Sequence, residues 1–267
     1  MGTRCNDESA RPIENTYTED LLETIMSDTS FTTEQLVAIA NRILADENVL
    51  DAFGHVSARH PGESGRYLIS RARSPELVEP GDVGVFTLES DPLEPNQPKS
   101  YAERVIHGEI YLQRPEVNAV CHFHAPAIMP FCVTGTPLIP VTHVGATVGL
   151  HVPFWSSRDD FGNTDLIVGT REQGQSLAAA LGSNWAVLMR NHGAVVVGRS
   201  IKEMVFRTTA LCLNAEILQK ALAVGTPDPL TNEEIELAGA FNLQPIALDR
   251  AWERWLHKLA KIGAMPH

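Results

Sequence analysis

The chain has 267 residues and 43% hydrophobic content, which suffices for the core of one large or two small domains. Its 21 basic and 33 acidic residues give a net charge of −12, and no cluster of lysine and arginine occurs that could neutralise a run of phosphates, which argues against a nucleic-acid partner. Apolar runs such as "WAVLM" fall far short of the roughly 20 residues of a membrane span, and the N-terminal segment lacks the apolar stretch of a signal peptide. We therefore expect a cytoplasmic protein without a membrane partner.

The first predicted unit is a polar and acidic N-terminal arm at residues 1–30, to which we assign no chemistry. A helix is predicted next, because Thr32 and Gln35 have the spacing of a capping box and apolar residues then recur at helical intervals. Short strands follow in the manner of hairpins or a meander, separated by proline, glycine and charged residues. These strands are expected at 54–60, 66–70 and 83–88.

The remaining elements alternate between predicted helices and strands. A helix at 101–112 leads into a strand at 118–124, and two strands in "WAVLMRNHGAVVVG" meet at Asn191-His192-Gly193. The other helices are predicted near Pro126 and at 170–182, 200–225, 231–241 and 247–261. No repeat or low-complexity linker interrupts residues 31–267, and strict βαβ alternation is missing. We therefore expect one α/β domain, with a largely antiparallel or mixed sheet between helices.

Two histidines stand at the end of the apolar segment "NAVCHFH", at positions 122 and 124. Because alternate residues of a strand face the same side, His122 and His124 point together, while Cys121 and Phe123 point away. This arrangement is consistent with two metal ligands and also with two histidines that are hydrogen-bonded in a polar cavity. Further ligands are needed to distinguish the two interpretations.

Two further candidates stand close to this strand in the predicted topology. Glu103 lies on the helix that leads into it, and His192 lies at the tight junction of the two later strands. His107 follows Glu103 by four residues on the same helical face, where it either supports Glu103 or the metal, or only packs in the helix. Taken singly, Glu103 is also compatible with a solvated helix surface and His192 with a turn. Taken together with His122 and His124, they form a donor set suited to Zn²⁺, Mn²⁺, Fe²⁺ or Co²⁺, and the spacing does not name the ion.

The segments "YAERVIHGEIYLQRPEVNAVCHFHAP" and "RNHGAVVVGRSIKEMVFRTTALCLNAE" closely resemble the class II aldolase/adducin-head family, and the resemblance extends over about residues 31–225. It implies that His122, His124 and His192 bind a divalent metal ion, and that Glu103 lies against the ion as an acid/base or an exchangeable ligand. It also implies a single-domain α/β/α sandwich with a central, mainly antiparallel sheet, assembled as a homotetramer with active sites between subunits. Adducin heads lack the ligand histidines, so their presence here argues against a purely structural role.

Three segments depart from the pattern of family members that act on sugar phosphates. His55 in "GHVSARH" replaces an asparagine, "ISRARSPELV" replaces a threonine-glycine segment, and a tyrosine and an alanine replace two serines before the glutamate. In their place, Arg71 and Arg73 can present guanidinium groups to a carboxylate with Ser70 beside them, although both arginines are also compatible with a surface loop. These segments resemble the subgroup of metal-dependent decarboxylases of hydroxylated aromatic and pyridine dicarboxylates, such as 3,4-dihydroxyphthalate decarboxylase.

The sequence therefore predicts a carbon–carbon lyase of aromatic catabolism: a non-oxidative decarboxylase of a hydroxylated aromatic (di)carboxylate, with one Mn, Zn, Co or Fe ion per subunit. The ion stabilises the negative charge that forms on oxygen as the bond breaks. Glu103 or His55 is the expected proton donor, and Arg71, Arg73 and Ser70 are expected to bind a second carboxylate. The alternatives are a class II aldolase that cleaves a hydroxy-keto acid or sugar-derived substrate, and a non-catalytic oligomeric head.

Residues of less certain role lie outside these motifs. His143 and His151 either line the pocket or are buried in a core or interface. Trp252, Arg254 and Trp255 are candidates for a lid over a flat substrate from a neighbouring subunit, and aromatic residues at helical spacing are also typical of interface core.

Overall fold

The computed structural model describes residues 31–267, so the predicted N-terminal arm lies outside the described part of the chain. A 7-stranded sheet runs through this part in the order β3-β2-β1-β4-β7-β6-β5, and every neighbouring pair is antiparallel except β5 and β6. The prediction of a mainly antiparallel sheet is confirmed, and the first three strands form a meander. The strands are β1 His55–Arg59, β2 Arg66–Ser70, β3 Val83–Thr87, β4 Ala119–Phe123, β5 Phe154–Trp155, β6 Ala186–Met189 and β7 Gly193–Gly198.

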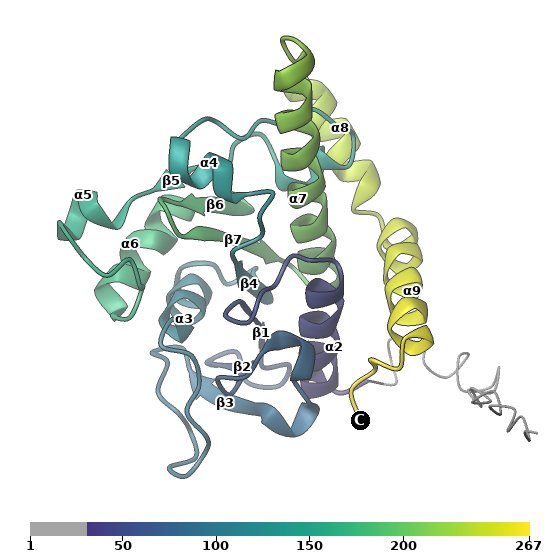
Figure 1. Ribbon diagram of the computed structural model, residues 1–267. Coiled ribbons are helices and arrows are strands. Elements are labelled where there is room, and N and C mark those ends of the chain that lie inside the picture. The colour runs from purple at the N-terminus through teal and green to yellow at the C-terminus, as the bar shows by residue number, and fades with distance from the viewer. Residues whose placement is uncertain (1–30) are drawn as a thin grey trace, which may run out of the picture. The chain divides into compact units, whose positions relative to one another are not determined.

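Helices cover both faces of the sheet (Figure 1). The helices α3 and α6 pack against one face over an apolar core that includes Ile106, Ile110 and Leu177, whereas α2 and α7 pack against the other face with α9 outside them. Within residues 31–267, no helix combines the length and the apolar character needed to cross a bilayer. The helices are α2 Thr33–Asp46, α3 Arg104–Gln113, α4 Met129–Thr134, α5 Ser157–Phe161, α6 Arg171–Leu181, α7 Ile201–Val224, α8 Asn232–Asn242 and α9 Pro245–Lys261.

The first residues of the helices agree with the local sequence signals in some places and differ in others. The capping box predicted before α2 is present, because the Thr32 hydroxyl accepts from the Gln35 backbone and the Gln35 side chain accepts from the Thr32 backbone. The start predicted at residue 101 is wrong, since α3 begins at Arg104 and Glu103 is its N-cap with non-helical dihedral angles. The short helix predicted near Pro126 is present as α4, but it begins at Met129, after a turn.

Candidate active site

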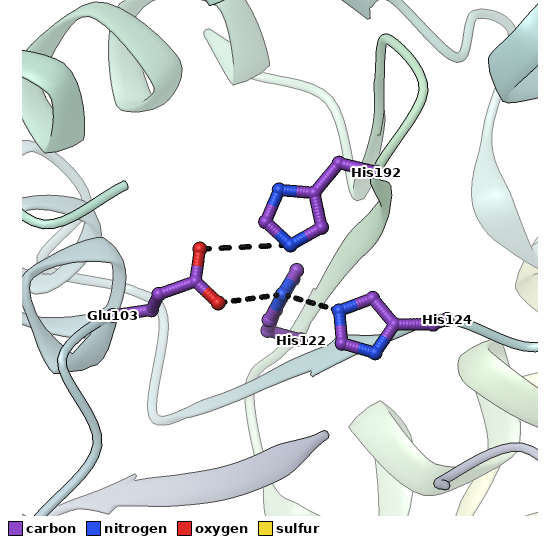
Figure 2. A group of neighbouring side chains, drawn as sticks. All are labelled: Glu103, His122, His124 and His192. Carbon is purple, nitrogen blue, oxygen red and sulfur yellow. Dashed lines mark hydrogen bonds and ion pairs between the residues drawn. The ribbon is translucent and has the colours of Figure 1, made fainter. Parts of the chain in front are cut away.

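Four side chains, Glu103, His122, His124 and His192, converge at the end of the central strands (Figure 2). Glu103 is the N-cap of α3, His122 lies in β4, His124 directly follows β4, and His192 lies in the turn between β6 and β7. One potential ligand atom from each lies within 4.8 Å of all the others. The structure therefore brings together the four residues that the sequence proposed as a metal site.

The orientation of His122 is fixed because it lies in β4, a central strand of the sheet. Its strand pairs with β1 on one side and β7 on the other, so that His122 lies opposite His55 and Val195, and its side chain is fully buried. Its Nδ1 lies 3.1 Å from the carbonyl oxygen of Ala194, which can only accept a hydrogen bond. Nδ1 of His122 therefore carries a hydrogen, and Nε2 points toward Glu103 Oε2 at 3.5 Å.

His124 is oriented by a carboxylate that the sequence analysis did not single out. Its Nδ1 lies 3.2 Å from Asp51 Oδ1, and its Nε2 lies 3.0 Å from His122 Nε2. Burial and the charge of His122 lower the pKa of His124 to about 4, although Asp51 raises it. A neutral His124 with its hydrogen directed at Asp51 presents the lone pair of Nε2 to the cluster, where it can bind a cation.

The turn that carries His192 is built from a strained residue and a close backbone approach. Asn191 adopts a left-handed conformation with φ of 54°, which asparagine tolerates better than most residues. A Cβ on Gly193 would lie 2.3 Å from the carbonyl oxygen of Phe123 and 2.8 Å from Cδ2 of His124. Only glycine therefore lets β7 approach β4 closely enough to place His192 Nε2 3.6 Å from Glu103 Oε1.

Glu103 completes the cluster from the opposite side. Its Oε1 accepts a hydrogen bond of 3.0 Å from the backbone N–H of Val168. Burial raises the pKa of Glu103, but the charges and hydrogen bonds of His122 and His192 outweigh burial and hold the pKa well below its usual range. The carboxylate is therefore ionised, and it can bind a cation or accept a proton.

The donor chemistry of this cluster fits a divalent ion. Imidazole and carboxylate donors are the usual ligands of Zn²⁺ and related transition metals. The outer nitrogens of His122 and His124 are held by Ala194 and Asp51, which is how the ligand histidines of metal sites are commonly oriented. The cluster therefore offers a donor set suited to a divalent metal ion.

A cavity of about 440 Å³ opens beside the cluster. His55 lines the cavity from β1, and Tyr101 also lines it. The ring centroids of His55 and Tyr101 are 4.4 Å apart. Burial, and then the charges of His107 and His122, lower the pKa of His55 well below its usual value. The remaining lining is largely apolar. The cavity is lined by Phe53, His55, Tyr101, Ala102, Glu103, His124, Ile167 and His192.

The proposed substrate-binding residues lie behind Tyr101 and do not line this cavity. Arg71 and Arg73 both bind Asp82, with nitrogen–oxygen distances of 2.6 Å in each pair. Ser70 is buried and lies 3.2 Å from the hydroxyl of Tyr101, which donates to the carbonyl oxygen of Arg73. Tyr101 therefore connects the segment with the two arginines to the cavity wall.

The other candidates lie away from the cavity. His107, for which support of Glu103 or the metal and packing in the helix were both open, forms a hydrogen bond with His55. His143 and His151 are exposed. Trp252 and Trp255 are buried on α9, and Trp255 packs edge-on against Phe206 of α7, which favours core packing within the chain.

Three residues at or beside the site were not predicted, because no motif marks them. Phe53 and Ile167 are exposed apolar loop residues that line the cavity, and Asp51, which orients His124, is one of many acidic residues in the sequence. The one signal in the sequence was an aspartate shortly before Phe53 and Gly54, whose backbone N–H groups donate to it in a turn typical of aspartate.

Comparisons with known proteins identify the family of this chain. A model of the class II aldolase and adducin N-terminal domain matches residues 34–218. Decarboxylase tropJ of Talaromyces stipitatus is 33% identical over 246 residues, covering 83% of this chain and 91% of that protein. The 3,4-dihydroxyphthalate decarboxylase of Arthrobacter keyseri is 27% identical over 250 residues, covering 86% and 94%. The solved structure of L-fuculose 1-phosphate aldolase from Glaciozyma antarctica has a TM-score of 0.73 at 19% identity, covering 92% of this chain and 99% of that one. The inferred family, subgroup and fold are confirmed.

Proposed function

Because this chain belongs to the class II aldolase and adducin N-terminal domain family, we propose that it is a divalent-metal-dependent decarboxylase of a hydroxylated aromatic carboxylate or dicarboxylate. The observation that carries the proposal is the convergence of Glu103, His122, His124 and His192 beside a largely apolar cavity. The decarboxylases among its relatives support this reaction over others of the family.

In this proposal His122, His124 and His192 hold one ion of Mn, Zn, Co or Fe, and Glu103 is a further, exchangeable ligand or an acid/base. When bound, the ion supplies Lewis acidity, which stabilises negative charge on a substrate oxygen next to the carbon whose bond breaks. The orientation of the ligand histidines by Ala194 and Asp51 supports this assignment. A non-catalytic head would have no use for such an arrangement.

Glu103 is the proposed proton carrier. Its ionised carboxylate takes the proton from a ring hydroxyl of the substrate, which leaves an oxyanion. Glu103 then delivers this proton to the ring carbon that bears the departing carboxylate, so that the oxyanion becomes a carbonyl and the ring loses its aromaticity. The bond to the carboxylate breaks, CO₂ leaves, and the electron pair of that bond returns to the ring, which restores the aromatic ring and the oxyanion. His55 is the second candidate for the group that transfers this proton, since it also lines the cavity.

The walls of the cavity support a flat aromatic substrate. Phe53, Tyr101 and Ile167 offer apolar surface on which a ring can pack. Arg71, Arg73 and Ser70 stay the proposed site for a second carboxylate, which requires at least one arginine to exchange Asp82 for the substrate. We further propose that the protein is cytoplasmic and a homotetramer with sites between subunits.

Aldol cleavage is the second candidate, because the same cluster would stabilise the oxyanion formed in either reaction. The observation that favours it is the close structural match to an aldolase. The largely apolar lining and the replaced phosphate-binding segments favour decarboxylation.

The test is CO₂ release from ortho-hydroxylated aromatic and pyridine mono- and dicarboxylates, measured with metal-stripped protein before and after addition of Mn²⁺, Zn²⁺, Co²⁺ or Fe²⁺. We expect one or more ions to restore CO₂ release without O₂ uptake. Absence of CO₂ release with every ion, together with cleavage of a hydroxy-keto acid, would replace the decarboxylase by an aldolase.

A further inference from the structure

A buried chain of hydrogen bonds leads away from the cavity behind His55. His55 Nδ1 lies 2.7 Å from His107 Nε2, His107 Nδ1 lies 2.6 Å from Ser57 Oγ, and Ser57 Oγ lies 2.8 Å from Tyr111 Oη. Each of the four side chains is at most 1% exposed. His55 and Ser57 are alternate residues of β1, and His107 and Tyr111 are four apart on α3, so one face of the strand meets one face of the helix.

The number of hydrogens in this chain restricts how they are arranged. The three hydrogen bonds each contain one hydrogen, and each of the four neutral side chains carries one. One hydrogen is therefore left for an end of the chain, on either the Tyr111 hydroxyl or His55 Nε2. If one imidazole were charged, the chain would contain a fifth hydrogen, and both ends would then carry a hydrogen.

The two ends differ in what they face. At the inner end, the Tyr111 hydroxyl bonds to Ser57 Oγ. Burial raises the pKa of Tyr111, whereas a hydrogen bond with the Val120 backbone lowers it, so the Val120 group is an N–H donor. Within residues 31–267, no side chain or carbonyl other than Ser57 accepts a hydrogen bond from the Tyr111 hydroxyl. A buried hydroxyl hydrogen without an acceptor is unfavourable. At the outer end, His55 lines the cavity, where a substrate oxygen can accept a hydrogen bond. The Tyr111 hydroxyl therefore donates to Ser57, Ser57 donates to His107, and His107 donates to His55.

From this direction of donation we infer that His55 is held as a neutral imidazole with its hydrogen on Nε2, and that it donates a hydrogen bond to an oxygen of the bound substrate. His107, Ser57 and Tyr111 are positioning residues, which act through His55. The inference rests on the proposed function, because the recognised group is an oxygen of the aromatic acid. No proton leaves His55 in this role, so Glu103 alone carries the proton of the reaction.

The inference explains why this chain has a histidine at position 55. A neutral imidazole donor can stabilise charge that develops on a substrate oxygen, and it requires no change of its own protonation state. His107, which lies behind His55, determines which nitrogen of His55 carries the hydrogen. The aromatic ring of Tyr101, 4.4 Å from that of His55, limits the rotation of the imidazole on the cavity side.

Two substitutions at one position provide the test. In His107→Gln the amide can still donate to His55 Nδ1 and accept from Ser57, which preserves the direction of the chain. In His107→Glu the carboxylate can only accept, which forces the hydrogen of His55 onto Nδ1. We expect kcat to fall by about 100-fold more in His107→Glu than in His107→Gln, with little difference in KM. Equal kcat values would overturn the inference.

Nitrogen NMR measures the tautomer of His55 directly in the native protein, which is labelled with ¹⁵N-histidine and studied both metal-free and loaded with Zn²⁺. The His55 signal is assigned from its loss in His55→Gln. We expect hydrogen on Nε2, and hydrogen on Nδ1 would overturn the inference. If the native protein released no CO₂ but His55 carried its hydrogen on Nε2, the proposed function would fail while the tautomer assignment stood.

A pair of phenol substitutions gives a matched control. Tyr111→Phe removes the inner end of the chain, so Ser57 becomes free to accept, and we expect a mixture of His55 tautomers and a several-fold lower kcat. Tyr67→Phe removes an equally buried hydroxyl that instead contacts Ser90 and the carbonyl oxygen of Arg104. A tautomer mixture in both variants, or in neither, would contradict the role of Tyr111.

Discussion

The carboxylate of Asp51 lies 3.2 Å from Nδ1 of His124, on the side of the ring opposite to His122. Asp51 Oδ1 also accepts hydrogen bonds from the backbone of Phe53 and Gly54, so the same side chain holds the loop and orients the imidazole. A carboxylate in this position increases the basicity of the other ring nitrogen.

Asp51→Asn is therefore expected to weaken metal binding by about 10-fold, because such outer partners typically contribute 10- to 100-fold in affinity. The asparagine oxygen can still accept from the loop backbone, so the fold should be unaffected. Competition with a chelator measures the affinity. Glu216→Gln, which removes an exposed carboxylate paired with Lys220, is the control. Equal affinities of the two variants would contradict this role of Asp51.

Glu103→Gln tests proton transfer separately from metal binding. The amide oxygen can still accept from Val168 N–H, so the site geometry is preserved. We expect kcat to fall by about 1,000-fold or more, in the range typical of a lost acid/base group, while the three histidines keep the ion within about 10-fold of native affinity. Metal analysis and CO₂ release measure the two effects. Full activity in this variant would eliminate the catalytic role of Glu103.

Gly193→Ala is expected to disturb the site through the backbone. The added methyl group would lie 2.3 Å from the Phe123 carbonyl oxygen, so β7 must move away from β4. We expect a loss of about 1–3 kcal/mol in the free energy of unfolding, as for other overpacked positions, together with weaker metal binding. Gly65→Ala, where no atom lies within 4 Å of the new Cβ, is the control. Chemical denaturation measures the loss, and a stable variant with native metal affinity would refute the argument.

Arg73→Ala tests whether the arginine segment binds a second carboxylate. We expect KM to rise by about 10-fold for a dicarboxylate, since hydrogen bonds to charged groups contribute roughly 1.5–3 kcal/mol. KM for the matching monocarboxylate should not change. Arg66→Ala, which removes an exposed arginine paired with Glu63, is the control. A parallel rise of KM for both substrates would mean that Arg73 acts through the structure of its loop.

Asp82 should make the stability depend on pH. Burial raises its pKa, but hydrogen bonds with the Glu79 backbone, Arg71 and Arg73 lower it below the ordinary 3.8. A carboxyl group whose pKa is lowered on folding stabilises the protein above its unfolded pKa, and this contribution disappears as pH falls through the folded pKa. Asp82→Asn should therefore be less stable than the native protein by about 1–2 kcal/mol at pH 7. Denaturation at several pH values should show the difference shrinking below about pH 4. A constant difference would be the contrary result.

The sequence predicted the parts of the site that depend on local periodicity or on the family motif. The alternation of His122 and His124 along one strand placed both imidazoles on one side, and the resemblance supplied Glu103 and His192. The pairing of His107 with His55 was missed, because it joins a helix to a strand about 50 residues earlier and depends on how α3 lies across β1. Asp82 as the partner of Arg71 and Arg73 was missed because it depends on the register of β2 and β3, in which Ser70 lies opposite Val83.

The β4–β7 pairing has a consequence for how the site arises during folding. His192 comes beside His122 only when Val195 lies opposite His122 in the ladder, and a register shift by one residue would turn His122 to the other side of the sheet. If the cluster binds the proposed ion, we therefore expect high affinity only in the completed sheet and not in a partly folded chain. Release of the ion should accompany the separation of these two strands, even where the outer helices are still formed.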